Sequence, residues 1–216
     1  MSSIEPPSDC ALCPRLVEFR SANRQAFPAF HNGPVRAFGP LDSRLLIVGL
    51  APGLKGANQT GRPFTGDYAG DLLYQTLGKF GFAEGTYGRT ADDGLVLKDC
   101  RITNAVRCVP PENKPIGSEG QNCRPFLATE IEQMDRLQVI LCLGGLSHAA
   151  VLTTLSARKV LYPFGHGRLH RFDRVTIADS YHCSRYNTNT GRLTVGMFEE
   201  VFGAIRQLLI TVPKQS

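Results

Sequence analysis

Four short apolar runs, separated by segments with helical periodicity, constrain the fold of this chain more than any other feature. The runs cover residues 44–49, 100–106, 138–143 and 174–179, and helical segments are predicted over residues 14–25, 71–80, 122–137, 147–155 and 194–209. Short unbroken apolar runs are typical of strands that are buried on both faces. Strands that alternate with helices form a mainly parallel sheet covered by helices on both sides. The sequence therefore predicts the α/β class.

The size of the chain favours one domain. With 216 residues, of which 42% are hydrophobic, it can build one well-buried core. We assign residues 1–216 to a single domain, with flexible ends over 1–9 and 211–216. The net charge of +5 permits a polyanionic partner but does not require one. No apolar run is long enough for a membrane span and no signal peptide is recognised, so we expect a cytoplasmic monomer without a membrane partner.

The longest predicted connection follows the first strand and covers residues 49–70, GLAPGLKGANQTGRPFTGDYAG. Connections from strand to helix are normally a few residues long, so this one is expected to be functional. A disordered insertion is the alternative, but Phe64 among glycines and a proline favours an aromatic ring held in place. Two more loops, 104–111 and 180–192, also begin where strands end. All three should meet at the carboxyl edge of the sheet, where such folds bind ligands.

Seven cysteines are many for a cytoplasmic protein, and their odd number argues against a disulfide framework. Cys100 and Cys142 lie in apolar runs and are expected to be small buried hydrophobic residues. A CxxC pair and a wider pair form a candidate metal-binding set, namely Cys10, Cys13, Cys108 and Cys123. Four thiolates suit either structural zinc or an iron–sulfur cluster, and the spacing alone does not choose between them.

Side chains with distinct chemistry occupy the three loops. His182 follows the last strand and is suited to stabilising an anion or transferring a proton. Cys183 beside it suggests a nucleophile pair, but neighbouring residues of an extended chain face opposite sides. Asp67 is the one carboxylate of the first loop, Asn104 offers an amide that can read a base edge, and Phe64 offers a stacking face. Together these groups describe a pocket for a flipped nucleobase.

Further polar residues complete the predicted binding surface. Ser184 and Arg192 belong to a polar loop of the kind that holds phosphates, and Gly49 and Ala51 lie at the start of the first loop. We assign all four to substrate binding. A nucleotide- or cofactor-binding enzyme that uses the first loop as a phosphate cradle is a competing hypothesis. Neither GxxxxGK[ST] nor GxGxxG occurs in the chain, which argues against it.

Five phrases, GLAPG, TGRPFTGD, ITNAVRCVPPENKP, NCRPFL and SYHCSRYNTNTGRLT, resemble the uracil-DNA glycosylase superfamily, specifically its family 5 or type-B iron–sulfur enzymes. The resemblance covers nearly the whole chain in order. It implies a three-layer α/β/α fold with a short, mainly parallel central sheet. It also implies a 4Fe–4S cluster held by the four-cysteine set. The implied activity is hydrolytic removal of uracil, and of deaminated bases such as hypoxanthine, from DNA.

The resemblance also implies roles for individual residues. Phe64 matches the aromatic residue that stacks on the extruded base, and Asn104 matches the residue that binds its Watson–Crick edge. His182 matches the residue that stabilises negative charge on uracil O2. Related branches carry a carboxylate or amide close to the GLAPG phrase to position water, whereas this chain has Leu50 and Ala51 there. The carboxylate role therefore passes to Asp67.

Cys183 is a departure, because the family usually has proline after this histidine. We expect a looser loop, an unchanged histidine position and a thiol open to oxidation, but no nucleophilic role for the cysteine. A protein of another class remains an alternative. An iron–sulfur or zinc module that binds nucleic acid without catalysis would bind DNA and release no base.

Overall fold

The computed structural model describes residues 3–172 and 174–211. Its central sheet has five strands in the order β4-β1-β5-β7-β6. Four of them are parallel, namely β1 (Leu45–Gly49), β4 (Cys100–Asn104), β5 (Val139–Leu143) and β7 (Thr176–Ser180). The edge strand β6 (Leu169–Arg171) is antiparallel to β7. The predicted short, mainly parallel sheet is thereby confirmed.

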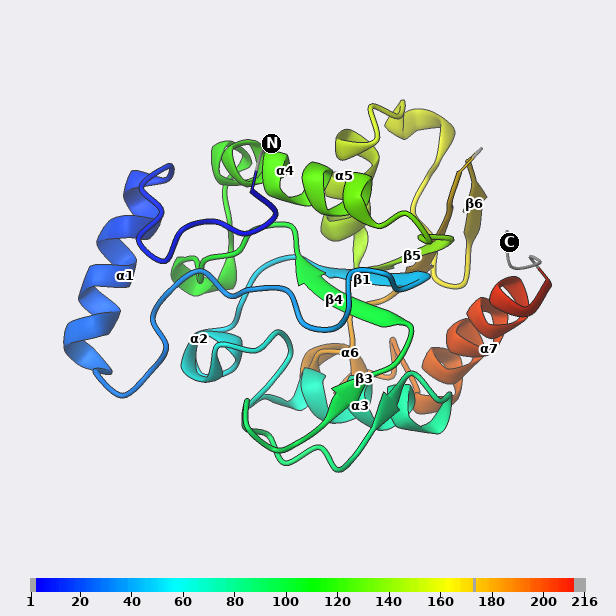
Figure 1. Ribbon diagram of the computed structural model, residues 1–216, viewed down its shortest axis with the longest axis horizontal. Helices are drawn as coiled ribbons and strands as arrows, with labels where there is room; N and C mark the ends of the chain where they lie inside the picture. The colour runs from blue at the N-terminus through cyan, green and yellow to red at the C-terminus, as the bar shows by residue number, and fades with distance from the viewer. Residues whose placement is uncertain (1–2, 173, 212–216) are drawn as a thin grey trace.

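Helices cover both faces of this sheet, which confirms the three-layer arrangement (Figure 1). One core contains Leu45 and Ile47 together with residues of α3 (Tyr68–Lys79) and α7 (Val195–Thr211). The other contains Leu46 and Val48 together with residues of α4 (Gly117–Gln133) and α5 (Gly145–Thr154). Side chains that alternate along β1 therefore enter opposite cores, as a strand buried on both faces requires.

The remaining elements are short or lie outside the three layers. They are the helices α1 (Pro14–Ala26), α2 (Ala57–Thr60) and α6 (Arg185–Asn189), the 3-10 turns η1 (Pro111–Asn113) and η2 (Lys159–Leu161), and the hairpin strands β2 (Ala83–Glu84) and β3 (Val96–Leu97). The helices α2 and α6 lie in segments predicted to be loops, and β6 was not predicted.

Helix α4 begins five residues earlier than the periodicity predicts. The Glu119 carboxylate accepts a hydrogen bond from the backbone N–H of Ile116, at 2.9 Å, and closes the first turn. The same carboxylate accepts two hydrogen bonds from Arg15 of α1, at 2.7 and 2.9 Å. A side chain that satisfies an N–H of the first turn is a normal start signal for a helix. Here the signal lies in polar sequence outside the apolar pattern.

The expected flexible ends are only partly open to comparison, because residues 1–2 and 212–216 lie outside the described part of the chain. Within it, the Glu5 carboxylate pairs with Arg107 at 3.1 Å and with Arg101 at 3.4 Å. It also accepts a hydrogen bond from the Ala37 N–H. Both arginines contact the fully buried Glu130 at 2.6 Å. Glu5 is thus held against β4 by a network of charges.

In the part of the chain that the structure describes, no helix is long and apolar enough to cross a membrane.

Candidate active site

A cleft opens at the carboxyl edge of the sheet and contains about 1440 Å³ of space free of atoms, part of it open to solvent. The predicted loops contribute Ala51, Phe64, Asp67, Asn104, His182 and Ser184 to its lining. Because β1, β4 and β7 are parallel strands of one sheet, the segments that follow them all begin at this edge. The structure therefore brings together six of the eight catalytic and substrate-binding residues assigned from sequence.

Gly49 is the last residue of β1, where this strand ends beside the edge strand β4. It is the register partner of Asn104. A side chain at this position would overlap the side-chain oxygen of Asn104 and place its Cβ 2.6 Å from Cζ of Phe64. Only glycine fits between the amide and the aromatic ring. Asn104 itself is 3% exposed, and its amide forms no hydrogen bond within the described part of the chain. The amide is therefore available to a ligand.

Phe64 is held in an unusual backbone conformation, with φ at +53°. Residues other than glycine rarely adopt this left-handed region, so the surroundings must enforce it. Its carbonyl oxygen accepts a hydrogen bond from the Tyr87 hydroxyl at 3.3 Å and lies where a side chain at Gly70 would overlap it. The Phe64 ring lies 5.9 Å from the His182 ring, measured between centroids. These contacts fix one aromatic wall of the cleft.

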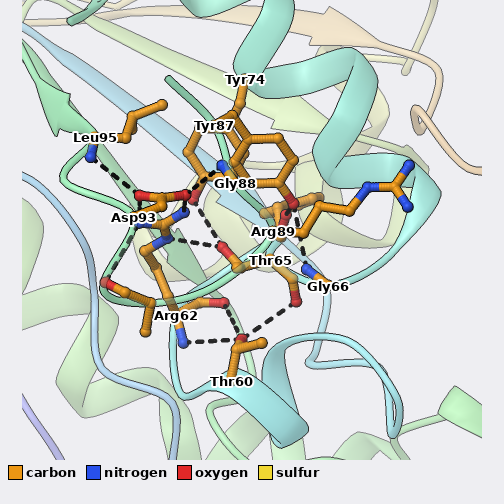
Figure 2. Close-up of polar contacts among 12 residues, drawn as sticks. Thr60, Arg62, Thr65, Gly66, Tyr74, Tyr87, Gly88, Arg89, Asp93 and Leu95 are labelled. Carbon is orange, nitrogen blue, oxygen red and sulfur yellow. Dashed lines mark hydrogen bonds and ion pairs between the residues drawn. The ribbon is translucent and has the colours of Figure 1, made fainter. Parts of the chain in front are cut away.

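A buried ion pair behind this wall holds the loop in place (Figure 2). The Arg62 guanidinium donates to both oxygens of Asp93, at 2.8 and 2.7 Å, and its Nε donates to the Thr65 hydroxyl at 2.8 Å. The guanidinium lies over the rings of Tyr74 and Tyr87, at 5.2 and 5.8 Å from their centroids. The hydrogen bonds from Arg62 keep the pKa of Asp93 well below its usual value. The pair therefore ties the Phe64 loop to the hairpin segment.

Asp67 lies at the N-terminus of α3 and caps the helix. One carboxylate oxygen, Oδ1, accepts a hydrogen bond from the Gly70 N–H at 3.2 Å. The other oxygen lies against the backbone of Gly53 and Gly56, where a Cβ would be 3.4 and 2.5 Å away. No hydrogen bond to Oδ2 occurs among the described residues. One oxygen thus fixes the orientation, and the other faces the cleft.

His182 faces Asp67 and Phe64 from the loop that follows β7. Burial lowers the pKa of the imidazole below its usual value, and the nearby Asp67 carboxylate partly opposes this shift. Its ring forms no hydrogen bond with the described residues, while its backbone oxygen accepts one from the Asn187 amide at 2.8 Å. Burial therefore favours the neutral imidazole, whose ring is free to contact a ligand while its backbone is fixed.

Cys183 points away from the cleft. Its side chain is fully buried in the core against α3, and its thiol donates to the Ala69 carbonyl oxygen at 3.4 Å. Burial raises the pKa of the Cys183 thiol. The absence of a nucleophilic pair with His182 agrees with the sequence argument. The expected exposure to oxidation is wrong, because the packing of the core covers the sulfur.

Helix α6 lies in the loop that follows β7 and determines which residues of this loop line the cleft. Ser184 caps this helix by accepting a hydrogen bond from the Asn187 N–H at 3.4 Å. Arg185 lines the cleft and lies 5.4 Å from the centroid of the Tyr68 ring. Arg192 lies outside the lining residues, stacked on the ring of Tyr181 at 4.6 Å. Sequence reasoning selected Arg192 and missed Arg185, because composition alone does not distinguish two arginines of one loop.

Sequence reasoning also missed three other lining residues with polar or charged side chains, namely Lys55, Tyr68 and Asn113. Lys55 was one polar residue within a long loop, and Tyr68 was counted with the helix that follows. Asn113 belongs to a turn in which it and Glu112 have positive φ values of 56° and 54°. The Pro-rich context of this turn was a usable signal, because such segments often aim polar side chains at a ligand. Lys55 and Arg185 add positive charge to the cleft.

The four-cysteine set lines one pocket between α1, α4 and the segment after β4. Cys13 is the N-cap of α1, and Cys123 lies in α4. The Cys123 sulfur accepts a hydrogen bond from the Arg107 N–H at 3.4 Å, and the Cys13 sulfur accepts one from Asn122 at 3.6 Å. Burial raises the pKa of Cys108 to about 12, and the positive charge of Arg20 acts in the opposite direction. Bound metal would convert these thiols to thiolates.

A second buried group of ligand-type side chains lies at β5, β7 and α5. The ligand atoms of Cys142, His148 and Asp179 lie within 4.8 Å of one another. Asp179 contacts Nδ1 of His148 at 2.7 Å and Nε2 of His170 at 3.0 Å. His148 also contacts the Tyr162 carbonyl oxygen at 2.9 Å. The group is compatible with a metal site, and its internal hydrogen bonds also satisfy it without an ion.

A three-layer α/β/α fold with a cleft at the carboxyl edge is typical of an α/β enzyme, and the separate pocket of four cysteines is compatible with a metal site. The family model of the uracil DNA glycosylase superfamily matches residues 36–206, and the chain belongs to this superfamily. It is 40% identical to the Type-5 uracil-DNA glycosylase of Pyrobaculum aerophilum over 197 residues, which cover 89% of this chain and 86% of the relative.

Two further relatives refine the comparison. The Type-5 uracil-DNA glycosylase of Thermus thermophilus is 40% identical over 206 residues, covering 92% of this chain and 93% of the relative. A Type-4 uracil-DNA glycosylase of Thermotoga maritima is 36% identical over 107 residues, which cover 49% of this chain and 47% of the relative. Likeness to the Type-5 proteins thus extends over most of the chain, which confirms the resemblance inferred from the five phrases.

Proposed function

We propose that this chain is a monofunctional uracil-DNA glycosylase that hydrolyses the bond between uracil and deoxyribose and leaves an abasic site. One observation carries the proposal. The Phe64 ring, the Asn104 amide, the Asp67 carboxylate and the His182 imidazole line one cleft at the end of the sheet. An aromatic face and an amide suit recognition of a flipped base, and a carboxylate beside a neutral imidazole suits cleavage of its glycosidic bond.

The arrangement supports a hydrolysis in which charge separates across the cleft. The extruded base stacks on Phe64 and pairs its edge with the Asn104 amide. As the C1′–N1 bond breaks, its electron pair leaves with the base, and the N–H of His182 stabilises the oxygen that gains negative charge. Asp67 stabilises the positive charge on the sugar and accepts a proton from the water whose oxygen bonds to C1′. Lys55 and Arg185 are placed to contact phosphates.

We assign a 4Fe–4S cluster to Cys10, Cys13, Cys108 and Cys123. Four sulfurs around a single zinc ion would lie about 3.8 Å from one another, given Zn–S bonds of about 2.3 Å. Among the described residues, the one group of three or more ligand atoms within 4.8 Å of one another is the Cys142 group. The wider spacing of the four-cysteine set supports a cluster over zinc. The cluster would link α1 and α4 to the segment after β4, and supplies structural support.

Base release is tested with purified protein and a uracil-containing oligonucleotide, followed by alkali and a denaturing gel. We expect strand cleavage only after alkali. Asp67→Asn should keep the helix cap, because an amide oxygen also accepts the Gly70 N–H, and should lose about 10² to 10⁴ in rate. Asp71→Asn is the matched control, because Asp71 lies in the same first turn and pairs with the exposed Arg89. It should retain full activity.

Binding without release of base would contradict the proposal and favour the non-catalytic nucleic-acid-binding module. The same assay with a hypoxanthine-containing strand tests the wider substrate range that we propose. Metal analysis of the same sample distinguishes iron from zinc. The cytoplasmic location and the monomeric state remain predictions.

A further inference from the structure

Arg20 of α1 is a buried cation whose hydrogen bonds are incomplete. The residue is 5% exposed, and its Nη2 donates to the Cys10 carbonyl oxygen at 3.1 Å. Its Nε and Nη1 atoms are buried and have no hydrogen-bond partner. Among the ion pairs of the described residues, none involves Arg20. The exposed Asp9, whose pKa is lowered chiefly by Arg24 and to a smaller extent by Arg20, pairs with Arg24. Burying a charge without an ion-pair partner is costly, so the position of Arg20 calls for an anion.

Arg20 lies beside the four-cysteine pocket, although it is not one of its lining residues. Leu16 lies one helical turn earlier on the same face of α1, and it lines that pocket. The one hydrogen bond of Arg20 is made to the backbone of Cys10, and its charge acts on Cys108. The nearby Arg107 differs, because Glu5 and Glu130 accept its terminal N–H groups. Of these two buried arginines, Arg20 is the one left without a carboxylate partner.

We propose that Arg20 is the charge partner of the cysteine-ligated centre, supplying one positive charge and two N–H donors to its anionic surroundings. This inference rests on the 4Fe–4S cluster proposed above. Each thiolate ligand carries a negative charge, so the guanidinium that is unbalanced in the described structure becomes balanced when the centre is loaded. Groups that bond or screen the sulfurs of a metal centre typically change metal affinity by about 10- to 100-fold, and they set its reduction potential.

The test compares Arg20→Met, which removes the charge but keeps the chain length, with Arg20→Lys, which keeps the charge. Arg24→Met is the matched control, because Arg24 lies one turn further along α1 in an exposed pair with Asp9. Iron and sulfide per chain, loss of visible absorption under a chelator, and the midpoint potential of the cluster are measured for each full-length protein. Arg20→Met should lose its cluster about 10- to 100-fold faster. Its potential should move to more negative values, because reduction adds an electron beside a lost positive charge.

Arg20→Lys should retain the cluster and a potential close to that of the wild type, as should Arg24→Met. Equal cluster loss in the Met and Lys variants with unchanged potentials would overturn the proposal and leave a packing role. If Arg20→Met does not fold, a folded Arg20→Lys protein that loses the cluster also overturns it. Wild-type protein that holds zinc or no iron refutes the cluster and this inference together. Wild-type protein that holds iron but releases no base refutes the catalytic proposal alone.

Discussion

Replacing Arg62 with methionine should damage both the stability and the activity of this protein, for separable reasons. The side chains of Arg62 and Asp93 are 5% and 4% exposed, so the substitution leaves a buried carboxylate with only the N–H groups of Gly88 and Leu95 as partners. Breaking a buried pair in this way costs about 3–5 kcal/mol. For a chain of this size, that corresponds to a fall of about 6–20 °C in melting temperature.

The activity should fall because the same guanidinium positions the loop that carries Phe64. Arg62 bonds the Thr65 hydroxyl and lies over the Tyr87 ring, and the Tyr87 hydroxyl in turn contacts the Phe64 carbonyl oxygen. Without the guanidinium, the left-handed backbone at Phe64 loses part of what enforces it. A displacement of about 1 Å in a group that positions substrate costs about 10²-fold in rate. We expect a loss of that order in kcat/KM on uracil-containing DNA.

A double mutant separates the two effects. Asp93→Asn removes the buried charge, so the protein carrying both Arg62→Met and Asp93→Asn should be more stable than Arg62→Met alone, while its activity stays low. Arg89→Met is the control, because the exposed Arg89–Asp71 pair should contribute less than about 1 kcal/mol. Unfolding is followed in denaturant, and base release is measured below every melting temperature. An Arg62→Met protein with full activity, or a double mutant no more stable than the single, would refute the reasoning.

The Arg62–Asp93 ion pair also predicts how the stability of the protein depends on pH. Arg62 lowers the folded-state pKa of Asp93 below its unfolded value of about 3.9. A group of this kind stabilises the fold above the unfolded pKa, and the contribution is lost as the pH falls through the folded pKa. The stability difference between wild type and the double mutant should therefore stay constant above about pH 4 and shrink as the pH falls below that value. A difference that does not shrink below about pH 4 would contradict this assignment.

Three further substitutions follow from the cleft. Because burial lowers the pKa of His182, the midpoint of any titration of this group in kcat/KM should lie below about pH 6.5; a midpoint above that value that His182→Gln abolishes would contradict this. Gly49→Ala should lose about 10²-fold in kcat/KM, because its Cβ overlaps the Asn104 oxygen and crowds Phe64; unchanged activity would show that the placement of these two side chains does not depend on glycine at this position. Cys183→Ser should retain activity and lose about 1 kcal/mol of stability, and an inactive but folded variant would reinstate a nucleophile.

The parts of the fold that the sequence predicted are those set by local pattern. Residues 45–49 and 139–143 are buried throughout, so an apolar run was sufficient to identify them as strands. Strand β6 has only three residues with alternating burial, and it exists because it pairs with β7. Helix α6 has five residues in a polar segment and depends on its cap at Ser184. Elements that short are decided by tertiary contacts and caps, which periodicity does not report.

The candidate site likewise has features that the sequence predicted and features that it did not. Parallel strands must end at one edge, so the convergence of Asp67, Asn104 and His182 followed from chain order alone. The Arg62–Asp93 pair joins residues 31 apart, and nothing in the local sequence connects them. The unpartnered atoms of Arg20 are likewise invisible without the packing around α1. What sequence reasoning missed is the support behind the site, since long-range contacts between single side chains leave no periodic signal.

A substitution at Asp67 tests whether the helix cap positions the carboxylate for catalysis, because its two carboxylate oxygens have different roles. Oδ1 caps α3 through Gly70, and Oδ2 reaches the cleft where Gly53 and Gly56 leave space. Asp67→Glu keeps the charge but adds a methylene where the Gly56 Cβ position is already 2.5 Å from Oδ2. We expect loss of the cap, about 0.5–2 kcal/mol of stability, and a fall in single-turnover rate comparable to that of Asp67→Asn. A glutamate variant with the wild-type rate would mean that charge alone matters and that the cap does not position the carboxylate.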